Sequence, residues 1–218
     1  MWDKEIIEKT VNFVKETLQD AEWGHDFWHI YRVRNNAKHI ATKEEGAKML
    51  VVELWALLHD IADSKFHDGD EEIWPMTART FLESLQIQME IITHVENIIR
   101  HISFKGVKEK QTFHSLELDI VQDADRLDAL GAIGIARTFN YWGFKGRGLY
   151  DPNIKPNLAM SKEEYKKSNT PSINHFYEKL FLLKDLMNTK TWKEMAQHRH
   201  EYMVQYVEEF YAERNGEL

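Results

Sequence analysis

Apolar residues recur every three or four positions over three stretches within the first 60 residues. The three sets are Ile7, Val11, Val14 and Leu18; Ile30, Val33, Ala37 and Ile40; and Val51, Leu54, Trp55 and Leu58. This spacing places the apolar side chains of each set on one side of an α-helix, where they can pack against a core. The pattern therefore predicts three helices in this part of the chain.

Helix-breaking residues are rare and unevenly distributed. No proline precedes Pro75, and five of the ten glycines lie between Gly131 and Gly148. The apolar spacing predicts further helices over residues 74–84, 86–102, 112–142, 172–188 and 191–213, with room for a break in the third of these. No stretch has the two-residue period of a strand. We therefore predict an all-α fold, with one domain over residues 1–218 and a loop over residues 143–156.

Four local patterns predict where helices begin. A Ser or Thr followed three residues later by Glu can satisfy backbone groups at a helix N-terminus, and Pro favours the first helical turn. The patterns are Thr42 with Glu45 ahead of the third helix, Ser161 with Glu164, Thr170 with Pro171, and Thr191 with Glu194. We expect a helix to begin at each of them.

Composition narrows the classes of function. The 218 residues include 28 Lys or Arg against 36 Asp or Glu, which gives a formal net charge of −8. A chain this acidic is a poor partner for polymeric nucleic acid or an anionic membrane, and the apolar run from Ala129 to Ala136 is too short to span a bilayer. The absence of cysteine excludes thiolate catalysis and Cys-ligated zinc. Since no secretory signal follows Met1, we expect a cytoplasmic protein whose metal ligands would be His, Asp or Glu.

Ionisable residues interrupt the apolar pattern directly after Leu58. His59, Asp60 and Asp63 follow that buried-looking run, and a charge in apolar surroundings is costly unless it is paired or binds a metal. His59 and Asp60, about 100° apart on a helix, could flank one ion, with Asp63 one turn beyond Asp60. An exposed helix end is the alternative.

A second interruption comprises three carboxylates and one guanidinium, Asp123, Asp125, Arg126 and Asp128. These residues lie between an apolar run and a run of small residues, which indicates a bound ion or an ion-pair network rather than a surface stripe of charge. Arg126 could contact a phosphate or form a salt bridge with Asp123, and both alternatives stay open.

The third interruption is the segment from Gly24 to His29. His25 and His29 are four residues apart and share a face if both are helical. The run is similar to the zinc-protease helix motif, with Asp26 in the place of Glu. That motif needs both histidines inside one helix, whereas Gly24 favours a helix that starts near His25, so the protease is the weaker alternative.

His29, the pair His59-Asp60 and Asp125 follow the order His, His-Asp, Asp. In this respect the chain resembles the HD-domain superfamily of metal-dependent phosphohydrolases. The runs at 24–33 and 123–131 resemble its YpgQ/YedJ-type branch of small bacterial proteins, and the likeness continues through residues 146–151 and 174–179. The family fold is a single-domain helical bundle around a metal site, which agrees with the periodicity.

The resemblance implies roles for individual residues. His29, His59, Asp60 and Asp125 match the metal ligands. They imply one divalent ion, with manganese, magnesium, nickel, cobalt and iron as the candidates. Asp63 matches an acidic residue that directs or deprotonates the attacking water, and His25 is a second candidate catalytic residue.

The implied substrate is a nucleotide, and the leading reaction is pyrophosphohydrolysis of a nucleoside triphosphate. A nucleotide phosphomonoesterase, a guanosine-alarmone hydrolase and a non-catalytic nucleotide-binding module are the alternatives. Residues 100–110 and 137–156 each carry four basic residues and one acidic residue, as phosphate binding requires. The candidate substrate-binding residues are Lys65, His101, Lys105, Arg126, Lys145, Arg147, His175 and Lys179. We expect a small phosphorylated partner, and a homodimer remains an open alternative to a monomer.

Overall fold

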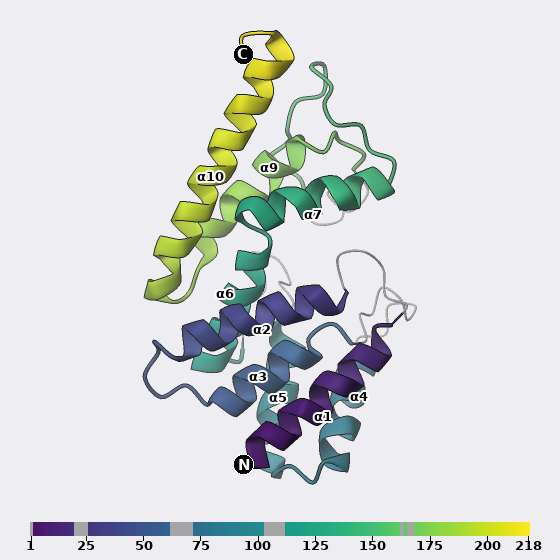
Figure 1. Cartoon of the computed structure of the whole chain (residues 1–218), viewed down its shortest axis with the longest axis vertical. Coiled ribbons are helices and arrows are strands. Elements are labelled where there is room, and N and C mark those ends of the chain that lie inside the picture. Colours follow the sequence, from purple (N-terminus) through teal and green to yellow (C-terminus); the bar gives the residue numbers. More distant parts are fainter. Residues whose placement is uncertain (1, 20–25, 62–71, 103–111, 162–163, 165–167) are drawn as a thin grey trace. The chain divides into compact units, whose positions relative to one another are not determined.

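Helices account for every regular element in the part of the chain that the computed structural model describes, which is residues 2–19, 26–61, 72–102, 112–161, 164 and 168–218 (Figure 1). They are α1 (Trp2–Thr17), α2 (Phe27–Ala41), α3 (Met49–Leu58), α4 (Ile73–Ser84), α5 (Met89–Ile102), α6 (Leu116–Asp128), α7 (Gly131–Phe144), α9 (Asn174–Glu178), the 3-10 helix η2 (Leu180–Leu186) and α10 (Lys190–Asn215). The prediction of an all-α fold is confirmed. No helix in these ranges is long and apolar enough to cross a membrane.

The chain divides into two compact units, which we call unit one (Met1–Ala124) and unit two (Asp125–Leu218). The division falls inside α6, which is one continuous helix. Whether the two units form the single domain expected over residues 1–218 stays a prediction.

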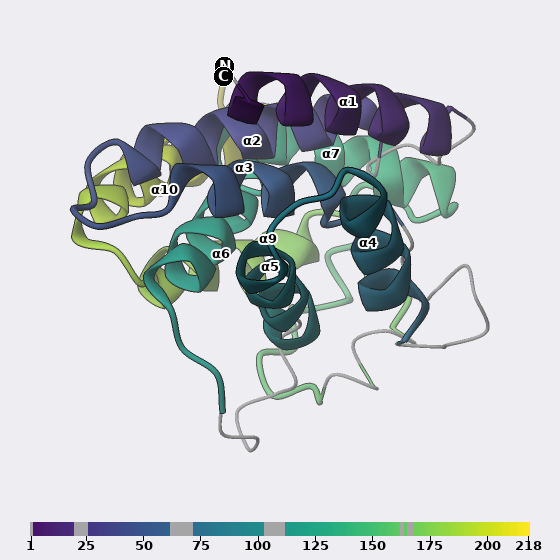
Figure 2. The same ribbon diagram turned by 90° about the horizontal axis from the view of Figure 1, so that it is seen from below.

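Helix α3 is the centre of unit one. Seven of its ten residues are buried, so it is apolar on nearly all sides, as expected for a helix enclosed by others. It packs against α1, α2 and α5, and lies between α5 and the α1–α2 pair in Figure 2. Helix α3 ends at Leu58, so His59 and Asp60 directly follow a buried helix.

Helices α2 and α3 form an antiparallel pair held by an ion pair between them. Arg34 donates from Nε and Nη2 to Glu53 Oε2 at 2.8 and 2.5 Å, and Lys38 Nζ lies 3.4 Å from the same oxygen. These contacts are largely shielded from solvent, since the Arg34 and Glu53 side chains are 19% and 12% exposed. The pair holds the start of α2 opposite the end of α3.

Three of the four predicted helix starts are wrong, and the helix expected after the fourth, Ser161, lies outside the described residues. Ser161 and Glu164 form a reciprocal capping box, with the Glu164 N–H donating to Ser161 Oγ at 3.2 Å and the Ser161 N–H donating to Glu164 Oε2 at 2.7 Å. Thr42 instead ends α2, and α3 starts after Lys48. The Lys48 N–H donates to Glu117 Oε1 at 2.8 Å, so a carboxylate 69 residues away satisfies the N-terminus of α3.

The other two starts are displaced by a few residues. Helix α10 begins at Lys190 after Thr189, rather than at Thr191. Helix α9 begins at Asn174, and the Thr170 hydroxyl donates to Glu178 Oε2 at 3.1 Å instead of capping the helix. The continuous helix expected over residues 172–188 is also wrong, because it is interrupted at Lys179, whose φ and ψ are −142° and −57°.

A sharp break separates α6 from α7 in unit two, inside the range 112–142 where a break was left open. Gly131 has a φ of +72°, which favours glycine. At Gly134 a Cβ would lie 2.2 Å from the carbonyl oxygen of Ala129, so only glycine fits this close approach. The loop predicted over residues 143–156 begins just after α7 ends at Phe144.

Candidate metal centre

His29 lies in the first turn of α2. The helix starts there because Asp26 is its N-cap, and Asp26 Oδ1 accepts a hydrogen bond from the His29 N–H at 2.9 Å. The His29 residue is buried, with 2% of its surface exposed. Since α2 begins at Phe27, the sequence HDFWH does not form the single helix that the zinc-protease motif needs, and that alternative is wrong.

His59 caps the C-terminus of α3. Its Nδ1 lies 2.8 Å from the Ala56 carbonyl oxygen, which can only accept, so Nδ1 donates this hydrogen bond and a neutral ring would present the Nε2 lone pair on its other side. The end of α3 is held from α4, because Trp74 Nε1 donates to the Leu58 carbonyl oxygen at 2.7 Å. Backbone groups thus determine both the position and the tautomer of His59.

Three atoms of unit one that could donate an electron pair to a metal ion lie close together at this end of α3. His59 Nε2 lies 3.1 Å from His29 Nε2, and Asp60 Oδ2 lies 3.4 Å from His29 Nε2 and 3.6 Å from His59 Nε2. Two ligands about 2.0–2.1 Å from one ion are separated by about 3.0 Å at a right angle and about 3.4 Å at a tetrahedral angle. The three separations are close to these values, so the donors fit one divalent ion.

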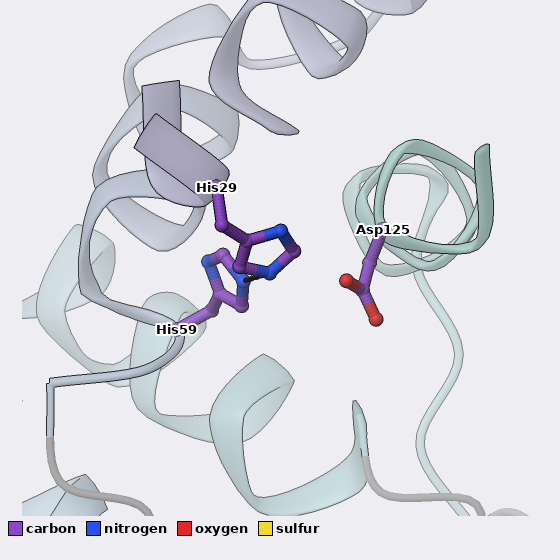
Figure 3. Close-up of side chains that lie close together, drawn as sticks. All are labelled: His29, His59 and Asp125. Carbon is purple, nitrogen blue, oxygen red and sulfur yellow. Dashed lines mark hydrogen bonds between the residues drawn. The ribbon is translucent and has the colours of Figure 1, made fainter. Parts of the chain in front are cut away.

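Asp125 is carried to the same place by α6. The carbonyl oxygen of the preceding residue, Ala124, lies 3.4 Å from Asn36 Nδ2, which links this turn of α6 to α2. Ligand atoms of His29, His59 and Asp125 all lie within 4.8 Å of one another, and Figure 3 shows the carboxylate facing the two imidazoles. These three residues could hold a metal ion, and Asp60 adds a second carboxylate beside the histidines.

The other predicted site residues either lie outside the described part of the chain or have the contacts given below. His25, Asp63, Lys65 and Lys105 lie outside the described residues. His101 lies on α5, where its Nδ1 donates to the Asn97 carbonyl oxygen at 2.7 Å and its Nε2 lies 3.3 Å from Thr112 Oγ1. Arg126 Nη1 donates to the Leu186 carbonyl oxygen at 2.5 Å within unit two.

Arg147 and His175 pack against Trp142 in unit two, and the charge of Lys179 acts on His175. The Arg147 guanidinium lies 3.4 Å above the Trp142 ring and donates to the Ser168 carbonyl oxygen, and the His175 ring packs edge-on against the same indole at 5.5 Å. Burial lowers the pKa of His175 to about 3, with smaller contributions from the charges of Lys179 and Arg147. Arg147 therefore fastens the loop after α7, and His175 is neutral at pH 7.

Lys145, the remaining predicted cation of unit two, lies at the end of α7. Its Nζ is 5.7 Å from the Tyr141 ring centroid and 5.3 Å from that of Phe144, both within the range of cation–π attraction. Tyr141 and Phe144 therefore both contact the cation at the end of α7.

Two aromatic residues that sequence reasoning missed support the end of α3 at which His59 lies. Trp55 stacks on the His59 ring at 4.9 Å and 21°, and the four-residue spacing between them is a signal that was present in the sequence. Trp74, which holds the Leu58 carbonyl oxygen, had no local signal because its partner lies on another helix.

The structure combines a helical fold with two histidines and two carboxylates that could bind one metal ion. This combination can be compared with known protein families. Residues 27–130 match the family model of the HD domain. The protein YpgQ of Bacillus subtilis is 37% identical over 209 residues, which cover 92% of this chain and 89% of YpgQ. The chain belongs to the HD-domain family, and the resemblance stated from the sequence is confirmed.

Solved structures agree over nearly the whole chain. A crystal structure described as an HD-superfamily hydrolase from Bacillus thuringiensis is 45% identical, covers 98% of both chains and has a TM-score of 0.78. The structure of Bacillus subtilis YpgQ in complex with ADP is 35% identical, covers 96% of this chain and 95% of its own, and has a TM-score of 0.74. These neighbours support an HD-superfamily hydrolase fold for the chain described here.

Proposed function

We propose that this protein hydrolyses phosphate bonds in nucleotides, with a nucleoside triphosphate as substrate and pyrophosphate as a product. The observation that carries the proposal is the convergence of His29 Nε2, His59 Nε2 and Asp60 Oδ2 within 3.6 Å, next to Asp125. The solved complex of the related YpgQ with ADP supports a nucleotide as the ligand.

The four donors would hold one divalent ion. Two imidazoles and two carboxylates suit Mn²⁺, Mg²⁺, Ni²⁺, Co²⁺ or Fe²⁺, and an octahedral ion would keep two positions for other ligands. A bound ion would supply Lewis-acid activation of a water molecule and of a phosphate oxygen. The chain contributes by holding the donors in place, and the Ala56 carbonyl keeps His59 in the tautomer whose Nε2 is a ligand.

Two residues that lie close in sequence to the proposed metal ligands are candidates for proton transfer. We propose that Asp63, three residues after Asp60, takes or directs the proton of the attacking water, and that His25 is the second candidate for this role. Lys65, Lys105, His101 and Arg126 are proposed to contact phosphate oxygens.

The proposal also assigns substrate binding to predicted residues of unit two. Arg147 and Lys179 flank the buried His175, and the ring contact of Arg147 with Trp142 holds its guanidinium in one orientation. We propose that these residues and Lys145 form the binding surface for the remaining phosphates or the sugar of the substrate.

A panel of nucleotides tests the reaction. Mono-, di- and triphosphates of each base and a guanosine alarmone are incubated with the protein and Mn²⁺, and phosphate and pyrophosphate are measured separately. Pyrophosphate from triphosphates supports the proposal. Phosphate from monophosphates would indicate a phosphomonoesterase, and cleavage of the alarmone alone an alarmone hydrolase. Binding without product would identify a regulatory module, and product formed equally by Asp60→Ala would reject the assigned centre.

A further inference from the structure

Trp55 and His59 form a parallel aromatic stack inside unit one. The two residues lie one turn apart on the same side of α3, with ring centroids 4.9 Å apart and ring planes 21° apart. Trp55 has no exposed surface, and the His59 residue is 5% exposed. The imidazole that presents Nε2 to the candidate metal centre therefore lies flat against a buried indole.

Two contacts together fix the orientation of this imidazole. The hydrogen bond from Nδ1 to the Ala56 carbonyl oxygen restricts rotation of the ring, and the indole face restricts its tilt. The His29 ring packs at 68° to the imidazole, with centroids 5.1 Å apart. With the ring held in this way, His59 Nε2 faces His29 Nε2 and Asp60 Oδ2.

The hydrogen bonding of Trp55 argues for more than core packing. Its Nε1 is buried and has no hydrogen-bond partner in the part of the chain that the structure describes. A buried donor without a partner is destabilising, and phenylalanine would provide an apolar ring without it. The feature of Trp55 that the site can use is therefore its ring face, not its polar atom.

We infer that Trp55 is a positioning residue for His59, and that an aromatic ring at position 55 sets the affinity of the centre for a divalent cation. This inference rests on the proposed metal site. Partners that orient a metal-bound histidine typically change metal affinity by about 10–100-fold when they are removed. We expect the dissociation constant for Mn²⁺ to rise about 10-fold in Trp55→Leu and Trp55→Met. In Trp55→Phe, which keeps a ring face, we expect it to stay within about 3-fold of the original value.

A second buried tryptophan offers a matched control. Trp192, in α10 of unit two, is also fully buried. Trp192→Leu removes the same side-chain volume from a core, so it should lower the unfolding midpoint in urea while leaving the Mn²⁺ affinity unchanged. Isothermal titration of Mn²⁺ into the metal-free proteins gives the affinities, and urea unfolding gives the stabilities.

Nitrogen-15 NMR of the histidine rings adds a readout that needs neither metal nor activity. The metal-free protein should show His59 as the Nδ1–H tautomer, and this signal should be retained in Trp55→Phe and become a tautomer mixture in Trp55→Leu or Trp55→Met. An Nε2–H tautomer in the unsubstituted protein overturns the inference whether or not the variants fold.

The binding data separate this inference from the proposed site. Unchanged Mn²⁺ affinity in Trp55→Leu, or equal losses in Trp55→Leu and Trp55→Phe, overturns the positioning role while the metal site stands. If Asp60→Ala binds Mn²⁺ as tightly as the unsubstituted protein, the metal site itself is refuted, and with it the dependence of metal affinity on Trp55.

Discussion

Replacing Asp60 by alanine removes the carboxylate oxygen that lies 3.4 Å from His29 Nε2 and 3.6 Å from His59 Nε2. A ligand present at 100 times its dissociation constant stabilises a folded protein by about 2.7 kcal/mol. In a protein of this size 1 kcal/mol corresponds to about 2–4 °C, so Mn²⁺ should raise the melting temperature of the unsubstituted protein by about 5–10 °C. A 100-fold loss of affinity in Asp60→Ala leaves about 0.4 kcal/mol of that stabilisation, or about 1 °C.

Differential scanning fluorimetry with and without Mn²⁺ measures both shifts. The control is Asp128→Asn, which weakens an ion pair in unit two in which the buried Asp128 Oδ2 accepts from Arg137 Nη1 at 2.6 Å. This variant should melt at a lower temperature without metal and still show the full Mn²⁺ shift. A full shift in Asp60→Ala would refute the reasoning that places the ion between these donors.

Three further predictions concern both units. Because His175 has a pKa of about 3 when folded and about 6.5 when unfolded, the folded state binds fewer protons. Its contribution to stability is therefore complete above pH 6.5 and is lost as the pH falls toward 3, by up to about 1.4 kcal/mol per pH unit. Urea unfolding should give a smaller free energy of unfolding at pH 5 than at pH 7, and His175→Phe should reduce this difference. An equal difference in both proteins would contradict the prediction. Gly134→Ala should destabilise the protein by about 1–3 kcal/mol because its Cβ meets the Ala129 carbonyl oxygen, whereas Gly143→Ala, with nothing within 4 Å, should be neutral or stabilising in a thermal melt. Asp63→Asn should keep the Mn²⁺ affinity and lose turnover of nucleoside triphosphates, and unchanged turnover would remove Asp63 from the mechanism.

The positions of the helices could be predicted because they depend on local spacing. The apolar period of residues 51–58 predicted α3, and the structure buries that helix on nearly all sides. The start of α3 could not be predicted, because the carboxylate that satisfies the Lys48 N–H belongs to Glu117 on α6. A local pattern cannot reveal a cap that comes from another helix.

The candidate site was predictable in its residue types but not in its geometry. The order of His29, His59-Asp60 and Asp125 predicted the donors, but their separations depend on how α2, α3 and α6 pack. The positive charge of Arg147 did not predict which groups this side chain contacts. It is partly buried, lies against Trp142 and donates to Ser168, and only the folded chain could show these contacts.

The hydrogen bond from Trp74 to the Leu58 carbonyl oxygen fastens α4 to the last turn of α3. The chain between them starts and ends at anchored points, and doubling the length of such a connection costs only about 0.6 kcal/mol of closure entropy. Changes in the length of that connection therefore cost the fold little, whereas exchanges at Asp63 or Lys65 would remove residues that we propose to act on the substrate. The end of α3 tolerates such changes of length because its support comes from α4, through the side chain of Trp74.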